Sequence, residues 1–549
     1  MPSAIEVVAL VCLSWYVFII LVCTIGYVQL FRRYSSLPQP AISSDLPDND
    51  VPHVTVIRPC KGKEPYLYQC LASTFQQAYP RHKLTIYLCV SSRQDVACTA
   101  IERVLRDYPE HDAKLLVEEE DPALTPESPQ GPTLGPNPKI RNMSRAYREA
   151  KGDLVWILDC NIWTGRGACG RMVDRLYGYS HAGQSRPFKF VHHLPLAVDV
   201  SSDEAAQEDH AIDNYEELPA LARVSSKDIL PGSASYFGGR LDEAFLSSAH
   251  AKMYVAINTV AVAPCICGKS SMFRRSHLNA LTNNDHSIDT RFGSGIDHFS
   301  ENICEDHLIG DLLWKAKIPA TMPTAVRSWK NHGLVYGDLA IQPVADMSIS
   351  NYIARRVRWL RVRKFTVPAA TLVEPGTESF MCSAMGAFGA TTSSYVRPLF
   401  GGSWLNLLFL WVVSISLWIA VDWTVYILLQ SGRTVEATSN GNQPKTELPP
   451  FARSLSIKRF ESRRPFITWL KAWFAREALT LPVWTWAIWG GVTVVWRDKK
   501  LWVGLDMKVH EIDDGMDQQR VPLLSRDQNG TSQADSSPAS KNGFKVRQD

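Results

Sequence analysis

The sequence has no large excess of charge of either sign. Its 549 residues contain 58 Lys and Arg against 55 Asp and Glu, a formal net charge of +3. Nucleic-acid binding through the phosphate backbone normally needs a strong basic surplus, so we predict no nucleic-acid partner. The length exceeds that of one ordinary domain, which predicts a soluble core joined to other segments.

A metal-binding cysteine pattern is also lacking. Of the 12 cysteines, Cys265 and Cys267 are one residue apart, a spacing that does not suit a zinc knuckle. Thiols in a cytosolic domain stay reduced, so disulfides are not expected. We interpret the cysteines as structural.

Long apolar runs are present. Residues 7–31 contain no charge and could cross a hydrocarbon core of about 30 Å as a helix that rises ~1.5 Å per residue. The run comes after Glu6 and is too long for a cleavable signal peptide, which would have a basic start. We predict a retained anchor, and Arg32 and Arg33 at its end place the next part of the chain in the cytosol.

Further apolar segments lie toward the carboxyl end, where many of the 17 tryptophans also occur. We predict transmembrane helices at 398–430 and 478–496, separated by a basic loop with an amphipathic segment at 431–477. Residues 366–397 include an uncharged stretch of Gly, Ala, Ser and Thr. This segment could be a tightly packed span, a re-entrant element or a buried loop at the membrane.

Residues 50–365 alternate short apolar runs with helical patterns. The runs have the character of strands buried in a parallel sheet, and they lie at 54–57, 84–90, 115–117 and 154–158. Between them, residues 67–75 and 101–108 repeat apolar side chains at helical spacing. We predict an α/β domain that binds its ligand at the carboxyl ends of the strands, as suits a nucleotide.

Two insertions and a tail depart from this pattern. Residues 121–138 are rich in proline, and residues 201–217 are acidic, so both are predicted as surface insertions. The segment 511–549 is polar and too poor in apolar residues to form a core, which predicts a disordered tail.

Three aspartates come after predicted strands or begin a predicted helix. Asp159 comes after the run 154–158, where it could bind a divalent metal on a diphosphate; the alternative is a turn aspartate that caps the next element. Asp95 could bind a nucleotide or cap the helix after it. Asp306 begins a helical pattern, where it could act as a base or serve only as an N-terminal helix charge.

A basic motif precedes the later apolar segments. It reads Arg355-Arg356-Val357-Arg358-Trp359. One interpretation is a basic amphipathic helix on an anionic membrane surface. The other is that Arg358 binds a leaving diphosphate while Trp359 stacks on a sugar or acceptor, and the two are compatible.

In this order, the three aspartates and the Arg-x-x-Arg-Trp motif resemble the signature of membrane-bound GT-A glycosyltransferases, and specifically of family 21, the ceramide glucosyltransferases. Supporting blocks extend the resemblance over most of residues 5–500. They are Ile57-Arg58-Pro59-Cys60-Lys61-Gly62, Asn137-Pro138-Lys139-Ile140-Arg141-Asn142, Val191-His192-His193-Leu194-Pro195 and Gly268-Lys269-Ser270-Ser271-Met272-Phe273-Arg274.

The resemblance implies a GT-A, Rossmann-like mixed sheet and a first step of glucosphingolipid synthesis. Glucose would pass from UDP-glucose to the primary hydroxyl of ceramide, with inversion, on the cytosolic face of Golgi-type membranes. A divalent metal, Mg or Mn, would be the cofactor. Asp306 would take the proton, and Asp159 would bind the metal and diphosphate. The other implied donor-binding residues are Asp95, Lys139, His192, Arg355, Arg358 and Trp359.

The sequence departs from the family pattern after Asp159, where Cys160-Asn161 supplies no second acid of an Asp-x-Asp motif. Two other interpretations stay open. A processive polysaccharide synthase of the chitin or hyaluronan type shares the motif order but needs more membrane spans. A non-enzymatic membrane scaffold would tolerate the loss of Asp159 or Asp306.

Overall fold

The computed structural model describes residues 3–124, 134–200, 236–283, 293–436, 448–455, 462–497 and 499–512. The predicted insertion at 201–217 lies outside the described residues, as does the predicted tail from residue 513 onward. The predicted insertion at 121–138 extends too far, because Pro138 is already the first residue of a helix that Asn137 caps.

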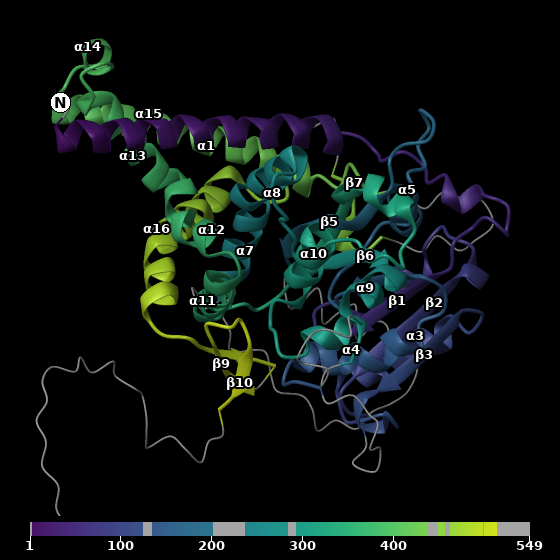
Figure 1. The fold of residues 1–549 in the computed structure, drawn as a ribbon. Helices are drawn as coiled ribbons and strands as arrows, with labels where there is room; N and C mark the ends of the chain where they lie inside the picture. The colour runs from purple at the N-terminus through teal and green to yellow at the C-terminus, as the bar shows by residue number, and fades with distance from the viewer. Residues whose placement is uncertain are drawn as a thin grey trace, which may run out of the picture. The chain divides into compact units, whose positions relative to one another are not determined.

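A seven-stranded mixed sheet forms the centre of the α/β domain (Figure 1). Its strands are β1 (Val54–Pro59), β2 (Leu84–Val90), β3 (Asp112–Val117), β4 (Leu154–Leu158), β5 (Phe188–Asp199), β6 (Ser270–Arg274) and β7 (Lys330–Val344). The order is β3-β2-β1-β4-β6-β5-β7, with β6 antiparallel to both of its neighbours and all other pairs parallel. The predicted α/β class with a Rossmann-like mixed sheet is confirmed.

Helices cover both faces of the sheet. Their bounds are α2 (Leu67–Phe75), α3 (Ala97–Asp107), α4 (Pro138–Arg148), α5 (Ala168–Tyr177), α9 (Arg275–Thr282) and α10 (Glu305–Lys315). Apolar residues of α2, α3 and α5 form one core with the sheet, and those of α4, α9 and α10 form another. Burial on both faces explains why β1, β2 and β4 are apolar runs rather than alternating patterns.

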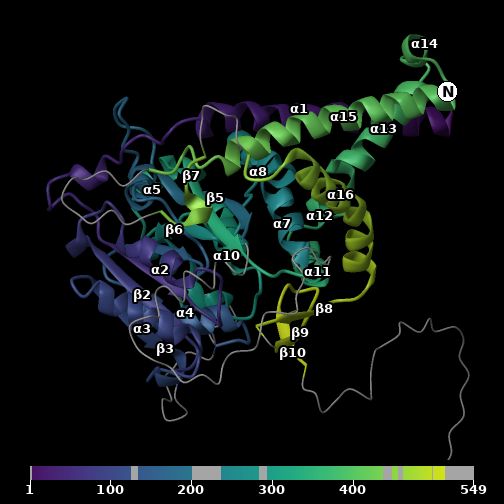
Figure 2. The same cartoon turned by 180° about the vertical axis from the view of Figure 1, so that it is seen from behind.

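Two helices among the described residues are long and apolar enough to cross a membrane. They are α1 (Ala4–Tyr34) and α15 (Trp404–Gln430), which lie side by side in Figures 1 and 2. The helix α8 (Ala249–Val260) packs against α1 at Gly26, where an added Cβ would lie 2.1 Å from the carbonyl oxygen of Lys252. Helix α1 is therefore in direct contact with α8.

The segment predicted at 366–397 contains α12 (Pro368–Val373) and α13 (Ser379–Thr392), and α14 (Arg397–Phe400) begins at its end. Gly386 and Gly389 of α13 pack tightly on α1, as expected of small residues between helices. Fourteen residues of helix rise about 21 Å, which is less than the roughly 30 Å hydrocarbon thickness. Helix α13 is thus a packed helix that is too short to cross on its own.

The prediction of one transmembrane helix over 478–496 is wrong in its bounds. Helix α16 spans Phe466–Trp489, and the chain then forms a three-stranded antiparallel sheet of β8 (Thr493–Trp496), β9 (Lys499–Val503) and β10 (Val509–Glu511). Helix α16 carries the buried Arg476, which pairs with Glu378 at 2.8 Å, so the helix packs against protein at this residue. Figure 2 shows the small sheet next to α11 (Ile349–Thr366).

Candidate active site

Asp159 lies directly after β4, at the edge of the sheet where β1, β2 and β4 end. Its two carboxylate oxygens face two ammonium groups, with Lys139 Nζ at 3.0 Å from Oδ1 and Lys269 Nζ at 3.2 Å from Oδ2. Burial alone would raise the pKa of Asp159, but the two lysines outweigh it and lower that pKa to about 2. Asp159 is therefore ionised and held in place.

The block around Lys139 is a helix start. The Asn137 side chain accepts hydrogen bonds from the backbone N–H groups of Lys139 (2.8 Å) and Ile140 (3.1 Å), and Pro138 occupies the first helical position. This cap fixes the first turn of α4, from which Lys139 reaches both Asp159 and Glu305, the latter at 3.1 Å. The two carboxylates raise the pKa of Lys139 although burial opposes them, so the side chain stays charged.

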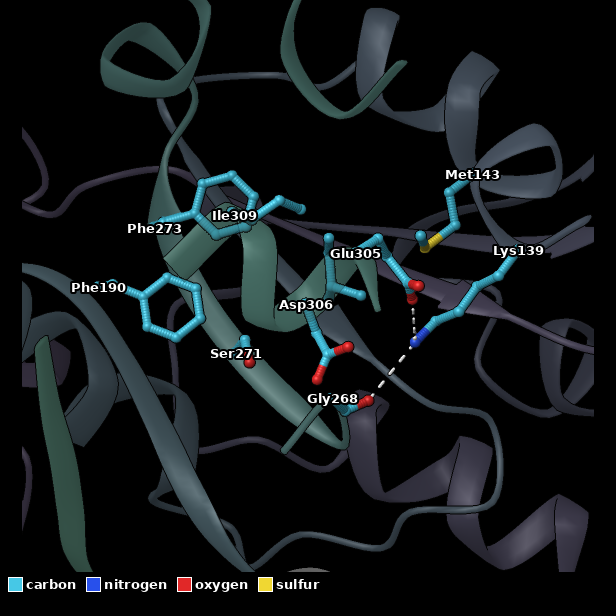
Figure 3. Close-up of a pocket in the computed structure, with 10 residues that line it drawn as sticks. Lys139, Met143, Phe190, Gly268, Ser271, Phe273, Glu305, Asp306 and Ile309 are labelled. Carbon is cyan, nitrogen blue, oxygen red and sulfur yellow. Dashed lines mark hydrogen bonds and ion pairs between the residues drawn. The ribbon is translucent and has the colours of Figure 1, made fainter. Parts of the chain in front are cut away.

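Glu305 and Asp306 occupy the first turn of α10 and line a pocket (Figure 3). Other lining residues are Lys139, Met143, Ile157, Phe190, Gly268, Ser271, Phe273 and Ile309. Burial raises the pKa of Asp306, and the charge of Lys139 only partly opposes this. Among the described residues, no side chain forms a hydrogen bond or ion pair with the Asp306 carboxylate, in contrast to Asp159 and Glu305.

Gly268 faces Asp306 across the pocket. A Cβ added at Gly268 would lie 2.6 Å from the Asp306 Cγ, which is closer than any ordinary contact. The absence of a side chain at residue 268 therefore leaves the space that the Asp306 carboxylate occupies. Figure 3 shows this carboxylate pointing toward Gly268 and Ser271.

The Arg-x-x-Arg-Trp motif lies on α11. Arg355 pairs with Asp242 of α7 (Gly238–Leu246) at 3.4 Å and donates to Gln342 of β7 at 3.2 Å. Its guanidinium also lies over the Trp359 ring, 4.8 Å from the centroid. Trp359 in turn packs beside Phe245, so the tryptophan supports the position of Arg355.

Arg358 is half-buried and has no ion pair with any described carboxylate. Burial, together with the positive charges of Arg355 and Arg497, lowers the pKa of Arg358 to about 10. The group is still cationic at neutral pH. An unpaired, desolvated arginine of this kind is suited to bind an anion.

Asp95 and His192 do not line the pocket that contains Asp306. Asp95 accepts hydrogen bonds from the backbone N–H groups of Gly62 (2.8 Å) and Ala97 (2.9 Å), so it joins the loop after β1 to the first residue of α3. His192 is fully buried behind the pocket, where its Nδ1 lies 2.6 Å from the Tyr254 hydroxyl. Burial lowers its pKa well below the usual value and keeps the ring neutral.

The arrangement of charges at Asp159 does not fit a metal site. Asp159 is a single carboxylate with each oxygen against an ammonium, and the described part of the chain has no group of three or more His, Cys, Asp or Glu residues that could hold a metal ion. A cation at Asp159 would need Lys139 or Lys269 to move away. The lysines already place positive charge there.

Sequence reasoning missed several partners that complete the site. These are Lys269, Asp242, Gln342 and Arg497, together with Glu305, which directly precedes Asp306. Lys269 lies inside a sequence block that carries the family resemblance, directly after Gly268. Its place in that block is a signal that could have identified it as a site residue. The others meet the motif only through strand and helix packing.

These features together define a glycosyltransferase of the GT-A class: a mixed sheet presents acidic and basic groups at its carboxyl edge, next to an Arg-x-x-Arg-Trp helix. The model of the family described as Glycosyl transferase family 21 matches residues 14–210 and 227–509, and the chain belongs to that family.

Two relatives in sequence agree with this assignment. A ceramide glucosyltransferase of Pyricularia oryzae is 46% identical over 524 residues, 93% of this chain and 96% of that relative. A ceramide glucosyltransferase of Gibberella zeae is 41% identical and covers 92% and 95%. A solved mannosyltransferase from Pyrobaculum calidifontis, in complex with GDP-Man and Mn2+, is 15% identical with a TM-score of 0.37, covering 77% of this chain and 96% of that one.

Proposed function

We propose that the chain transfers glucose from UDP-glucose to the primary hydroxyl of ceramide, with inversion to the β-glucoside. The observation that carries the proposal is the state of Asp306. Two pocket carboxylates, Asp159 and Glu305, are neutralised by lysine, whereas Asp306 has no side-chain partner among the described residues. Its carboxylate is therefore free to accept the proton of an acceptor hydroxyl.

The reaction divides between two groups of side chains. Asp306 removes the hydroxyl proton as the acceptor oxygen attacks the anomeric carbon of glucose. UDP leaves from the opposite face, and its diphosphate charge is neutralised by Arg358, which has no carboxylate partner among the described residues. Because a single displacement inverts the anomeric centre, no covalent intermediate with the enzyme is needed. A divalent metal on the diphosphate stays a prediction from the family resemblance, whereas its ligation by Asp159 does not fit the two ammonium groups that face this carboxylate.

The lipid acceptor is supported by an apolar groove on α16. The groove has a volume of about 520 Å³ and is lined by Leu481, Pro482, Thr485, Trp486, Trp489 and Gly490. Arg361 of α11 donates to the Gly490 carbonyl at 2.6 Å, which joins the groove to the helix that carries Arg358. Exposed tryptophans are typical of the membrane interface. At this interface the enzyme could reach the ceramide hydroxyl while the lipid stays in the bilayer.

The proposed location rests on the two candidate spans. We place α1 and α15 in a Golgi-type or related endomembrane as part of a multi-pass protein, with the sheet domain on the cytosolic side. The partners would be UDP-glucose, ceramide and membrane lipids. The remaining donor-binding assignments, to Asp95, His192, Arg355 and Trp359, are proposals on the same basis.

The test uses membranes that contain the wild-type chain or Asp306→Asn, incubated with radiolabelled UDP-glucose and ceramide. We expect labelled glucosylceramide, cleavable by a β-glucosidase, from the wild type and almost none from the variant. A labelled polymer instead of a lipid would support the polysaccharide synthase alternative. Equal lipid labelling by both proteins would contradict the role of Asp306.

A further inference from the structure

Arg497 lies in a backbone conformation that residues with a side chain rarely adopt. It comes after β8, at the turn that leads into β9, with φ at +49°. Two-residue hairpin turns require such positive φ values, and Asn or Gly normally supplies them. The backbone conformation disfavours arginine here. Its presence therefore indicates that the arginine side chain has a role of its own.

The turn is held against the sheet domain by several contacts. Lys61, in the loop after β1, donates from Nζ to the Arg497 carbonyl at 2.7 Å. The backbone N–H of Val509 donates to the Glu301 carbonyl at 2.7 Å, close to the start of α10. Val494, Leu501, Val503 and Val509 also form one apolar cluster with Val362 of α11. The small sheet is therefore fixed to three elements of the active site.

The Arg497 guanidinium lies 5.9 Å from the centroid of the Trp496 ring, and β8, directly before Arg497, packs against α11, the helix that carries Arg358. The charge of Arg497 acts on both Arg358 and Cys160, the residue after Asp159. Its Nη1 is buried and has no hydrogen-bond partner. Among the described residues, neither Arg497 nor Arg358 has a carboxylate within ion-pair distance. Two neighbouring cations with no carboxylate partner in the described part of the chain are suited to bind an anion.

We propose that Arg497 binds the diphosphate of the donor together with Arg358, so that the small sheet after α16 completes the donor site. The proposal rests on the proposed nucleotide-sugar donor and adds a binding residue that the motif does not contain. Arginine suits this role because its planar donor fork matches phosphate oxygens. The segment after the last apolar helix would then be required for donor binding, and not only for packing.

The experiment measures UDP and uridine binding to the purified full-length chain by equilibrium dialysis. The variant Arg497→Asn removes the charge but keeps a residue that tolerates positive φ. Arg497→Lys keeps the charge without the fork. Lys499→Asn, which breaks an exposed pair with Glu511 in the same sheet, is the matched control for a general loss of positive charge.

We expect Arg497→Asn to weaken UDP binding by about 10- to 100-fold, the effect of one charge-assisted hydrogen bond, while uridine binding stays unchanged. Arg497→Lys should lie between this variant and the wild type, and Lys499→Asn should bind UDP as the wild type does. Unchanged UDP affinity in Arg497→Asn, or an equal loss of UDP and uridine binding, would overturn the inference. A wild-type chain that binds no UDP would instead contradict the proposed function, which separates the two failures.

Discussion

The two cationic parts of the active site are neutralised in opposite ways. On the lysine side, Lys139 and Lys269 meet Asp159 and Glu305 at 3.0 to 3.2 Å, so the charges balance within the protein. On the arginine side, Arg358 and Arg497 have no carboxylate partner among the described residues. The lysine side is complete without substrate, whereas the arginine side becomes neutral only when an anion binds.

The largest expected effect comes from the one pocket carboxylate that no lysine pairs with. Asp306→Asn keeps the shape of the side chain but cannot accept a proton, so we predict that kcat falls by about 10²- to 10⁴-fold. Radiolabelled glucose transfer to ceramide measures the rate. UDP affinity should stay within a few-fold of wild type, and a kcat close to wild type would contradict the assignment.

The lysine side is tested by Lys139→Met, which leaves the buried Glu305 without a cationic partner and Asp159 with Lys269 alone. Breaking one partner of a buried pair costs about 3–5 kcal/mol, so we predict a large fall in the melting temperature of the purified chain. The matched control is Lys114→Met, which breaks a 2.6 Å pair with Glu149 in which the Lys114 side chain is 49% exposed.

An exposed pair contributes about 0–1 kcal/mol, so the control should melt close to wild type. Equal melting temperatures for Lys139→Met and Lys114→Met would show that the lysine side is not a preformed ion-pair network.

The arginine side is tested kinetically by Arg358→Met. Loss of a charge-assisted hydrogen bond costs about 1.5–3 kcal/mol, so we predict that the KM for UDP-glucose rises about 10- to 100-fold. The KM for ceramide should change little. If Arg358→Met raises only the KM for ceramide, Arg358 would have to be assigned to the acceptor site rather than the donor site.

The smallest expected effect is on the pH profile. Burial raises the pKa of Asp306 above 3.8, and the base acts only when it is deprotonated. Activity should therefore be full above this raised pKa and fall as the pH decreases through it. The residual rate of Asp306→Asn should lack this acid limb, and an unchanged acid limb in the variant would assign it to another group.

The sequence predicted some elements closely because single local signals were enough. The bounds of β2 and β4 match the apolar runs at 84–90 and 154–158, since strands buried on both faces are continuously apolar. The same reasoning failed at 478–496. There an uncharged run combined the end of α16 with β8, because composition alone does not show where a helix stops.

The sequence pointed to motif residues but not to the partners that hold them. Asp159 pairs with Lys139, which lines one pocket with Asp306, and Arg358 lies on α11; that the three form one site stays a prediction from the family resemblance. The residues that hold the motif arginine, Asp242 and Gln342, belong to α7 and β7, and only tertiary packing brings them to Arg355. No spacing in the sequence carries that information.

The most direct measurement of the difference between the two sides is the melting temperature of the purified chain with and without UDP, in the wild type and in Arg358→Met. Without UDP, we predict that the variant melts no lower than the wild type, because it loses an unpaired cation. With UDP, the wild type should be stabilised strongly and the variant weakly. A variant that melts several degrees lower without UDP, or gains as much from UDP as the wild type, would contradict an arginine side that only a bound anion neutralises.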